Sequence, residues 1–269
     1  MVKRIYNHET GKSVCLGRNR PPVDAKKLHF SKYVNLSTLP TAPAALSYAP
    51  KCYSALHEMY GNDTLGDCVI AEMLHSVGVF TGNADGGSPL KFTEPQVISV
   101  YSAIGGYVPG DPSTDNGCDE VTALNYWKAT GAPAGSNLIA GWLTVDGMDA
   151  EAYRTALWLF ENLMFGVELP DAWITPFPSQ SGFAWGVAGE PDPDNGHSFL
   201  GVAYSESEVW IDTWGMTGSL SDAAVAKYAS TAGSGELYTV LSPEAIIRAT
   251  AKAPSGFDFE QLQADLAAL

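Results

Sequence analysis

The amino-acid sequence predicts an α+β fold in which helices and strands occupy different parts of the chain. Apolar residues recur at helical spacing between positions 66 and 163, whereas short apolar β-like runs dominate between 164 and 241. This order favours separate helical and sheet layers. At 269 residues and 45% hydrophobic composition, the chain is long enough to bury a sizeable core.

Residues 1–48 are predicted to form an extended amino-terminal arm. Pro21 and Pro22 lie in its middle, and residues 39–50 hold three more prolines. Proline restricts the chain to extended conformations. We favour an arm that packs on its own domain, and keep as the alternative an assembly arm that reaches another subunit.

Helices are predicted in the first half of the chain. The strongest covers residues 66–81, where six large apolar side chains fall on one broad face and Asp67 lies at the amino-terminal end. The other predicted helices cover residues 94–102, 119–130 and 149–163.

Strands are predicted in the second half, at residues 164–169, 197–204, 209–213 and 237–241, with a long loop at 176–195. We therefore expect one domain at 49–241, with a helical half at 49–163 and a β half at 164–241. Residues 242–269 are expected to form a helical tail broken at 254–256.

Composition excludes several functions. A net charge of −15 and a pI near 4.5 argue against nucleic-acid binding and favour neutral or cationic substrates. No apolar stretch approaches the roughly 18 residues of a membrane span. Residues 1–19 lack the apolar core of a secretory signal, so we expect cytoplasmic synthesis. The four cysteines are too scattered for a disulfide scaffold or a zinc site, and no cofactor is expected.

Three residues suggest a catalytic site. Cys68 opens the strongest helix, His197 follows 129 positions later (197 − 68) at the start of a strand, and Asp212 follows after a further 15 (212 − 197). This is the chain order of a cysteine nucleophile, its base and the group that orients the base. A helix N-terminus lowers a thiol pKa and can hold an oxyanion.

Each of these residues has a plainer interpretation when taken alone. Most cysteines such as Cys68 are small buried core residues, and His197 fits a satisfied histidine beside a glycine turn. The ordered set shifts the balance towards a site. His75 lies seven residues after Cys68, roughly 10 Å along a helix, and is interpreted as a core or groove histidine. The acidic loop at 111–119 does not match a calcium-binding pattern, so no metal site is expected.

The chain resembles the papain-like cysteine peptidase superfamily. The resemblance rests on Asn62, on Gly-Asp-Cys at 66–68, on Gly-Cys-Asp at 117–119, on Asn-Gly-His at 195–197 and on Asp-Thr-Trp-Gly at 212–215. It implies a helical lobe, carrying the nucleophile helix, packed on an antiparallel β-sheet or barrel lobe.

The resemblance also implies roles for residues. Cys68 is the implied nucleophile, His197 the general base, Asp212 its orienting group and Asn62 the oxyanion donor of a peptidase or amidase. The residues implied to contact a peptide or amide substrate are Gly66, Asp67, Gly117, Trp185 and Trp214. Trp173 and Trp185 precede His197 and are candidates to gate the cleft, with large core or rim residues as the plainer interpretation.

The sequence departs from the superfamily pattern at several positions. Val69 replaces the aromatic residue that usually follows the nucleophile, and Leu65 replaces a cysteine that usually pairs with the one at Cys118. Cys118 is therefore expected to be unpaired. Asp212 replaces an asparagine, and an acid also orients an imidazole. Asn62 replaces a glutamine and is one methylene shorter.

More narrowly, the chain resembles a group of papain-fold proteins in bacteria and tailed phages. That group shares the Gly-Asn-Asp-x-x-Gly-Asp-Cys block at 61–68, the Gly-His and Thr-Trp-Gly blocks, and a tail like residues 252–258. Two functions follow as hypotheses. The first is a cysteine hydrolase (a thiol protease or amidase) working through an acyl-thioester. The alternative is a phage virion component that uses the fold as a scaffold, with the arm as its assembly contact.

Overall fold

A computed structural model of the chain describes residues 2–84, 86–253 and 255–268. An eight-stranded sheet forms its centre, in the order β4-β10-β5-β7-β8-β9-β6, with β3 paired to β7. The pairings are antiparallel except for the parallel pair β6 and β9. The strands are β3 (Leu46–Ser47), β4 (Gly141–Thr144), β5 (Leu163–Glu168), β6 (Phe183–Trp185), β7 (Gly196–Tyr204), β8 (Glu208–Thr213), β9 (Met216–Ser221) and β10 (Glu236–Leu241).

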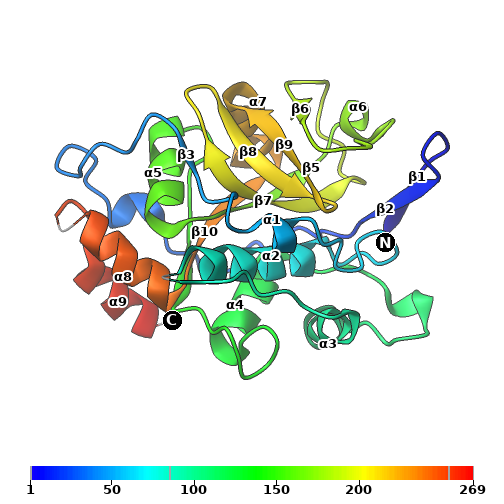
Figure 1. Cartoon of the computed structure of the whole chain (residues 1–269), viewed down its shortest axis with the longest axis horizontal. Helices are drawn as coiled ribbons and strands as arrows, with labels where there is room; N and C mark the ends of the chain where they lie inside the picture. The colour runs from blue at the N-terminus through cyan, green and yellow to red at the C-terminus, as the bar shows by residue number, and fades with distance from the viewer. Residues whose placement is uncertain (1, 85, 254, 269) are drawn as a thin grey trace.

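Helices pack around this sheet and confirm the predicted α+β class. Figure 1 shows α2 running below the strands, with α3 and α4 beneath it and α5, α8 and α9 gathered at one end of the molecule. The helices are α1 (Tyr53–Leu56), α2 (Cys68–Asn83), α3 (Glu94–Gly105), α4 (Glu120–Thr130), α5 (Ala150–Phe160), α6 (Asp171–Ile174), α7 (Asp222–Tyr228), α8 (Pro243–Lys252) and α9 (Phe259–Ala267).

Helix α2 is the buried centre of the helical half. Fourteen of its 16 residues are buried, because its apolar side chains surround the helix and pack on β7 as well as on neighbouring helices. It begins at Cys68, two residues later than the sequence predicts. Asp67 precedes it, but its carboxylate makes no capping hydrogen bond. The helix start is therefore held by packing and not by a side-chain cap.

Local capping explains the boundaries of the other helices. Thr93 and Gln96 form a capping box at the start of α3. The Asp119 carboxylate accepts from Thr122 at the start of α4, and Asp149 does the same for Ala152 at the start of α5. These polar residues stop the helices from extending backwards, which is why the sequence predicts their starts to within one residue.

The amino-terminal arm contacts its own chain along its length. It opens with a hairpin of β1 (Lys3–Asn7) and β2 (Lys12–Leu16), which the proline-based analysis did not anticipate. Further along, the Thr144 amide donates to the Leu28 carbonyl, and the Tyr48 amide donates to the Val202 carbonyl. In Figure 1 the hairpin projects at the end of the molecule near the start of α2.

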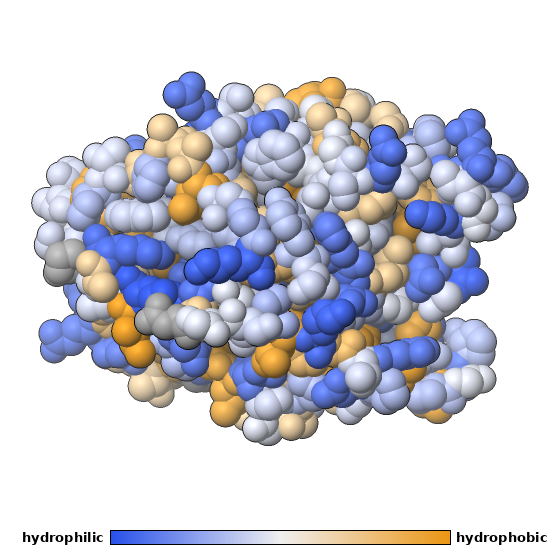
Figure 2. Space-filling view, viewed as in Figure 1, coloured by the Kyte–Doolittle hydropathy of each residue, from blue (hydrophilic) through white to orange (hydrophobic). Residues whose placement is uncertain are grey.

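The surface and the carboxy-terminal tail complete the description of the fold. On the face shown in Figure 2, hydrophobic residues lie in small groups between polar and charged ones. No helix in the described ranges combines the length and hydrophobicity of a membrane span. The tail forms α8 and α9 as the helical pattern predicts. Pro254, at the predicted break between them, lies outside the described residues.

Candidate active site

Cys68 lies at the junction of the helical half and the sheet. It is the first residue of α2, and its side chain is only 1% exposed. A small space of about 10 Å³ adjoins it, with room for no more than about one water molecule. Asn62, His75, Asp212 and Trp214 line the same space. The structure therefore gathers residues from both halves around the predicted nucleophile.

A segment of the arm, residues 15–19, covers Cys68. The Cys118 amide donates to the Gly17 carbonyl (3.0 Å), and the Arg18 amide donates to the Gly196 carbonyl (3.1 Å). A Cβ at position 17 would overlap the carbonyl oxygen of Gly66, so only glycine passes so close to the turn before Cys68. This cover, and not burial within the helix bundle alone, shields the thiol from solvent.

Burial controls the protonation of the thiol. Desolvation raises the pKa of Cys68, while backbone hydrogen bonding from Gly17 and Ser198 acts in the opposite direction and is outweighed. The expectation that the helix N-terminus lowers this pKa is wrong for the covered chain. The reason is physical: a thiolate loses more by leaving water than it gains from backbone dipoles.

His197 lies next to the Gly196–Arg18 contact, at the start of β7. Its ring stacks on Trp214 with centroids 4.5 Å apart, and its Nε2 lies 2.7 Å from the Thr213 Oγ1. Its Nδ1 has no hydrogen-bond partner among the described residues. Desolvation lowers the pKa of His197 to about 3, so the imidazole is neutral near pH 7.

Asp212 is not at His197, contrary to the expectation that it orients the base. Its Oδ2 lies 3.2 Å from His75 Nδ1, without the alignment of a hydrogen bond, and Nε2 of His75 faces the Glu58 carbonyl at 3.0 Å. Burial raises the pKa of Asp212 and lowers that of His75 to about 4. Burial therefore disfavours the charged form of both members of this pair.

Strand register explains this separation. Leu200 pairs with Asp212, so Asp212 shares a sheet face with the even-numbered residues at the start of β7. Ser198 is on that face and binds Glu72 of α2. His197 alternates to the other face, where Thr213 meets it.

Asn62 is engaged by the arm. Its Nδ2 donates to the Cys15 carbonyl and to the Leu65 carbonyl, both at 3.1 Å, and its own carbonyl accepts from the Cys15 amide. Both amide hydrogens are thus occupied in the covered chain. Of these two bonds, only the one to the Cys15 carbonyl involves the arm.

The other predicted contact residues divide between the cleft and the core. Gly66 donates to Asp115, and Gly117 donates to the Tyr101 hydroxyl. A Cβ at Gly117 would overlap the Gly17 carbonyl oxygen, so this glycine also borders the covering segment. Asp67 is buried with no partner for its carboxylate among the described residues, and burial raises its pKa.

Trp185 and Trp214 belong to a buried aromatic cluster. Trp185 stacks on Trp173 with centroids 4.6 Å apart and meets Trp214 edge-on at 6.0 Å. Both are at most 5% exposed. The expectation that Trp185 gates the cleft is therefore not met in this state: β6 pairs with β9 and draws this residue into the core.

A buried ionic cluster beside the cleft is a feature that sequence analysis missed. Arg18 Nε lies 3.2 Å from Glu120 Oε2, and its Nη2 lies 2.9 Å from Glu236 Oε2. Glu72 joins through the Ser198 hydroxyl, which contacts both Glu72 and Glu120. The acids come from separate elements, so no local pattern connects them to Arg18.

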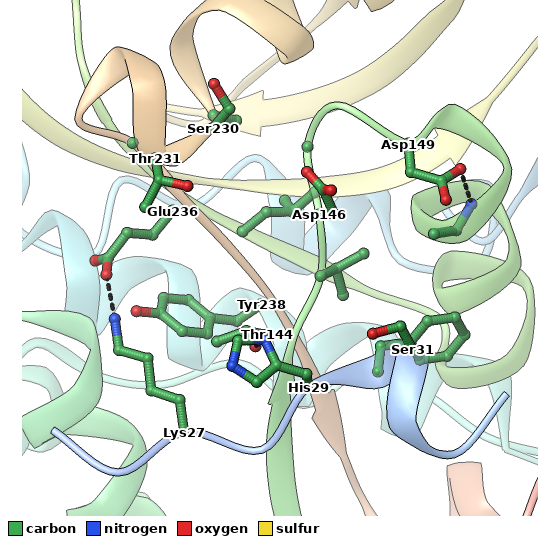
Figure 3. Close-up of a pocket in the computed structure, with 17 residues that line it drawn as sticks. Lys27, His29, Ser31, Thr144, Asp146, Asp149, Ser230, Thr231, Glu236 and Tyr238 are labelled. Atoms are coloured by element: carbon green, nitrogen blue, oxygen red, sulfur yellow. Dashed lines mark hydrogen bonds and ion pairs between the residues drawn. The ribbon is translucent and has the colours of Figure 1, made fainter.

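A larger pocket of about 370 Å³ lies elsewhere, between the arm and the sheet edge (Figure 3). Lys27 and His29 of the arm face Thr144, Glu236 and Tyr238 of the strands. Cys68 lines the smaller space and not this pocket, whereas His197 lines neither of them. We place the chemistry at the smaller site because it adjoins the predicted nucleophile. Within the described ranges, no three His, Cys, Asp or Glu side chains are grouped to hold a metal ion.

The fold is that of the papain-like cysteine proteases. Xylellain, a cysteine protease from Xylella fastidiosa, matches with a TM-score of 0.61 at 13% identity, over 84% of this chain and 96% of its own. The procathepsin B S9 of Trypanosoma congolense matches at 0.59 and 10%, over 84% and 86%. A digestive procathepsin L 3 of Tenebrio molitor matches at 0.56 and 12%, over 83% and 76%.

No protein-family model and no curated protein sequence matches the chain. At the identities given above, the structural likeness shows the fold alone. The arrangement of side chains around Cys68 must therefore carry any statement about activity.

Proposed function

We propose that the chain is a papain-like cysteine hydrolase acting on peptide or amide bonds, closed in this state by its own arm. One observation carries the proposal. Cys68 opens a buried helix exactly where an extended segment of polypeptide crosses it, held by backbone hydrogen bonds to Cys118 and Gly196. A site that holds an extended backbone against a thiol has the shape needed for a peptide substrate.

His197 is the proposed base. With Nε2–H donating to Thr213, the lone pair of Nδ1 is available to accept the Cys68 proton once the arm leaves and the strand start can adjust. Thr213 then takes the orienting role that the sequence assigned to Asp212. The stacked Trp214 keeps water from that hydrogen bond.

The proposed reaction is acyl transfer. The Cys68 sulfur adds to the substrate carbonyl carbon, the C–N bond breaks, and the amine leaves with the proton held by His197. Water then hydrolyses the thioester, releasing the acid and restoring the thiol. Asn62, after losing its contact with the Cys15 carbonyl, supplies one donor to the oxyanion.

The test measures alkylation of Cys68 by iodoacetamide in the full chain, with peptide mapping to separate the four thiols. We expect Cys68 to react faster when the arm is loosened by low denaturant, and His197→Gln to slow that reaction by about tenfold or more. Cys118→Ser is the matched control, since it removes another buried thiol. A Cys68 rate indifferent to His197 would contradict the proposal.

The scaffold hypothesis keeps one supporting observation, namely that Cys68 is sealed and makes no hydrogen bond to His197 in the described structure. On that hypothesis the chain is a virion or assembly component, associated with a phage particle. Cys68→Ala would then leave incorporation into the assembly unchanged. A hydrolase would lose its activity with the same substitution.

A further inference from the structure

We propose that the cleft at Cys68 selects substrates with an arginine side chain, which takes the buried acidic pocket that Arg18 fills in the closed chain. This inference rests on the proposed function and names its substrate class. Peptides with arginine near the reacting carbonyl are the predicted substrates.

The backbone around Arg18 is held in a way that any extended peptide can reproduce. Arg18 forms a parallel bridge with Cys118, its amide donates to the Gly196 carbonyl, and the next amide, of Asn19, donates to Cys118. These bonds involve main-chain atoms alone. They fix the path of a chain through the cleft, and leave selection to the side-chain pocket.

The pocket around the Arg18 side chain is built from two carboxylates. The Arg18 Nε forms an ion pair with Glu120 of α4, and its Nη2 forms one with Glu236 of β10. The Arg18 side chain is only 1% exposed. Burial lowers the pKa of Arg18, but the two carboxylates outweigh it and raise the pKa overall. A planar guanidinium bonds two carboxylates at once, which an ammonium does less well.

The shape of the pocket also fits a guanidinium. A Cβ at Gly166 of β5 would overlap the Glu120 carboxylate and crowd the Arg18 Nε, so glycine leaves the needed room. The buried hydroxyl of Tyr238 lies beside Glu236, one of the two carboxylates. These walls belong to the helices and strands and not to the arm.

Departure of Arg18 leaves negative charge unpaired. Lys27 binds only the Oε1 of Glu236, on the side of the larger pocket (Figure 3), and does not contact Glu120. Buried carboxylates without a cation are strongly unfavourable. The arginine side chain of a substrate restores the ion pairing, whereas a neutral or acidic side chain does not. In addition, the net charge of −15 attracts cationic peptides.

The experiment compares two peptidyl acyloxymethyl ketones that are identical except that one carries arginine where the other carries norleucine. The variable residue is placed first one and then two residues from the reactive ketone. The thiol displaces the carboxylate and forms a thioether, which intact-mass spectrometry follows on Cys68. In the full chain with Arg18→Ala, we expect the arginine probe to react about tenfold faster or more. Adding Glu120→Gln should remove this preference, and adding Lys27→Met should leave it.

Iodoacetamide, which has no recognition group, separates the possible failures. If it labels Cys68 in a His197-dependent way while both ketones react equally, arginine selection is wrong and the hydrolase proposal stands. If no reagent labels Cys68, both are wrong. If Arg18→Ala does not fold, the two ketones are compared on the wild-type chain, where both react slowly. Equal rates for the arginine and norleucine ketones would then overturn the inference.

Discussion

At the scale of single residues, Arg18 has the most consequential environment in the molecule. It is a buried cation that ties the arm to α4 and β10 through Glu120 and Glu236. Arg20, two positions later, pairs with Glu168 but its side chain is 59% exposed. Two arginines on one segment thus form ion pairs with buried carboxylates, and only the Arg20 cation is exposed to water, which allows a comparison.

We expect Arg18→Ala to lower the free energy of unfolding by about 3–5 kcal/mol, because it leaves the buried Glu120 carboxylate without a cation. Arg20→Ala should lower it by less, because water solvates the Arg20 guanidinium and weakens its attraction to the buried Glu168. Urea denaturation of both full-length variants measures the difference. Equal losses would show that the Arg18 cluster is not closed to water.

The buried histidines predict a pH dependence. His75 and His197 have folded pKa values of about 4 and 3, below the ordinary 6.5. Below pH 6.5 the unfolded chain therefore binds protons at these histidines that the folded chain does not bind. The stability contributed by the neutral histidines is present above pH 6.5 and is lost as the pH falls towards the folded pKa values. Each histidine should lower the free energy of unfolding by about 1.4 kcal/mol for each pH unit in that window.

Difference measurements isolate this effect from Asp212, whose raised pKa acts in the opposite direction as pH falls. Unfolding free energies of wild type, His75→Gln and His197→Gln are compared between pH 6.5 and 4.5. Each variant should show a shallower loss on acidification. The exposed His8→Gln is the control, and identical slopes in all four proteins would contradict the prediction.

At the scale of elements, the segment at 15–19 and the glycine turns around it determine whether Cys68 is accessible. Gly17 passes against Gly66, and Gly196 passes against the Arg18 carbonyl. These contacts are between backbones, so they tolerate no added side chain. The closed state depends on glycine at these positions.

Gly17→Ala is expected to displace the covering segment and to raise the rate of Cys68 alkylation by about tenfold or more, because the thiol then reaches solvent. Gly186→Ala is the matched control, since a Cβ there meets open space. Iodoacetamide labelling followed by peptide mapping gives the rates. An unchanged Cys68 rate in Gly17→Ala, with the fold intact, would show that the segment is not the barrier.

The helices and main strands were accessible to sequence analysis, whereas the pairing of site residues was not. Apolar periodicity marks α2 to α5, and capping residues mark the starts of α3, α4 and α5, because both signals depend on neighbouring residues. The face that His197 takes depends on register with β8, which is set by contacts distant in sequence. For the same reason, no local sequence pattern predicts three other features: the contact of Thr213 with His197, that of His75 with Asp212, and the Arg18 cluster.

At the scale of the whole molecule, the arm is part of the core and not an appendage. Phe30 and Tyr33 are almost fully buried, and Phe30 packs on Phe160 and Phe257 from α5 and the tail. The arm therefore packs against both the central domain and the carboxy-terminal tail. Removing it does more than uncover the cleft.

Deleting residues 1–45 is accordingly expected to abolish cooperative unfolding. Loss of the two buried rings alone removes about 3–6 kcal/mol, a large share of a typical total of about 5–15 kcal/mol. Circular dichroism during thermal unfolding measures this, with Tyr6→Ala on the exposed part of the hairpin as control. A deletion that still unfolds cooperatively would show that the arm is separable from the core.

The crossing of residues 15–19 over Cys68 has a kinetic consequence. A segment tethered to the site it occupies has an effective concentration on the order of millimolar. A peptide arriving from solution must compete with it, so its apparent affinity is its true affinity reduced by the fraction of open molecules. On the proposed function, the response of the chain to substrate therefore also depends on how long residues 15–19 stay on the cleft.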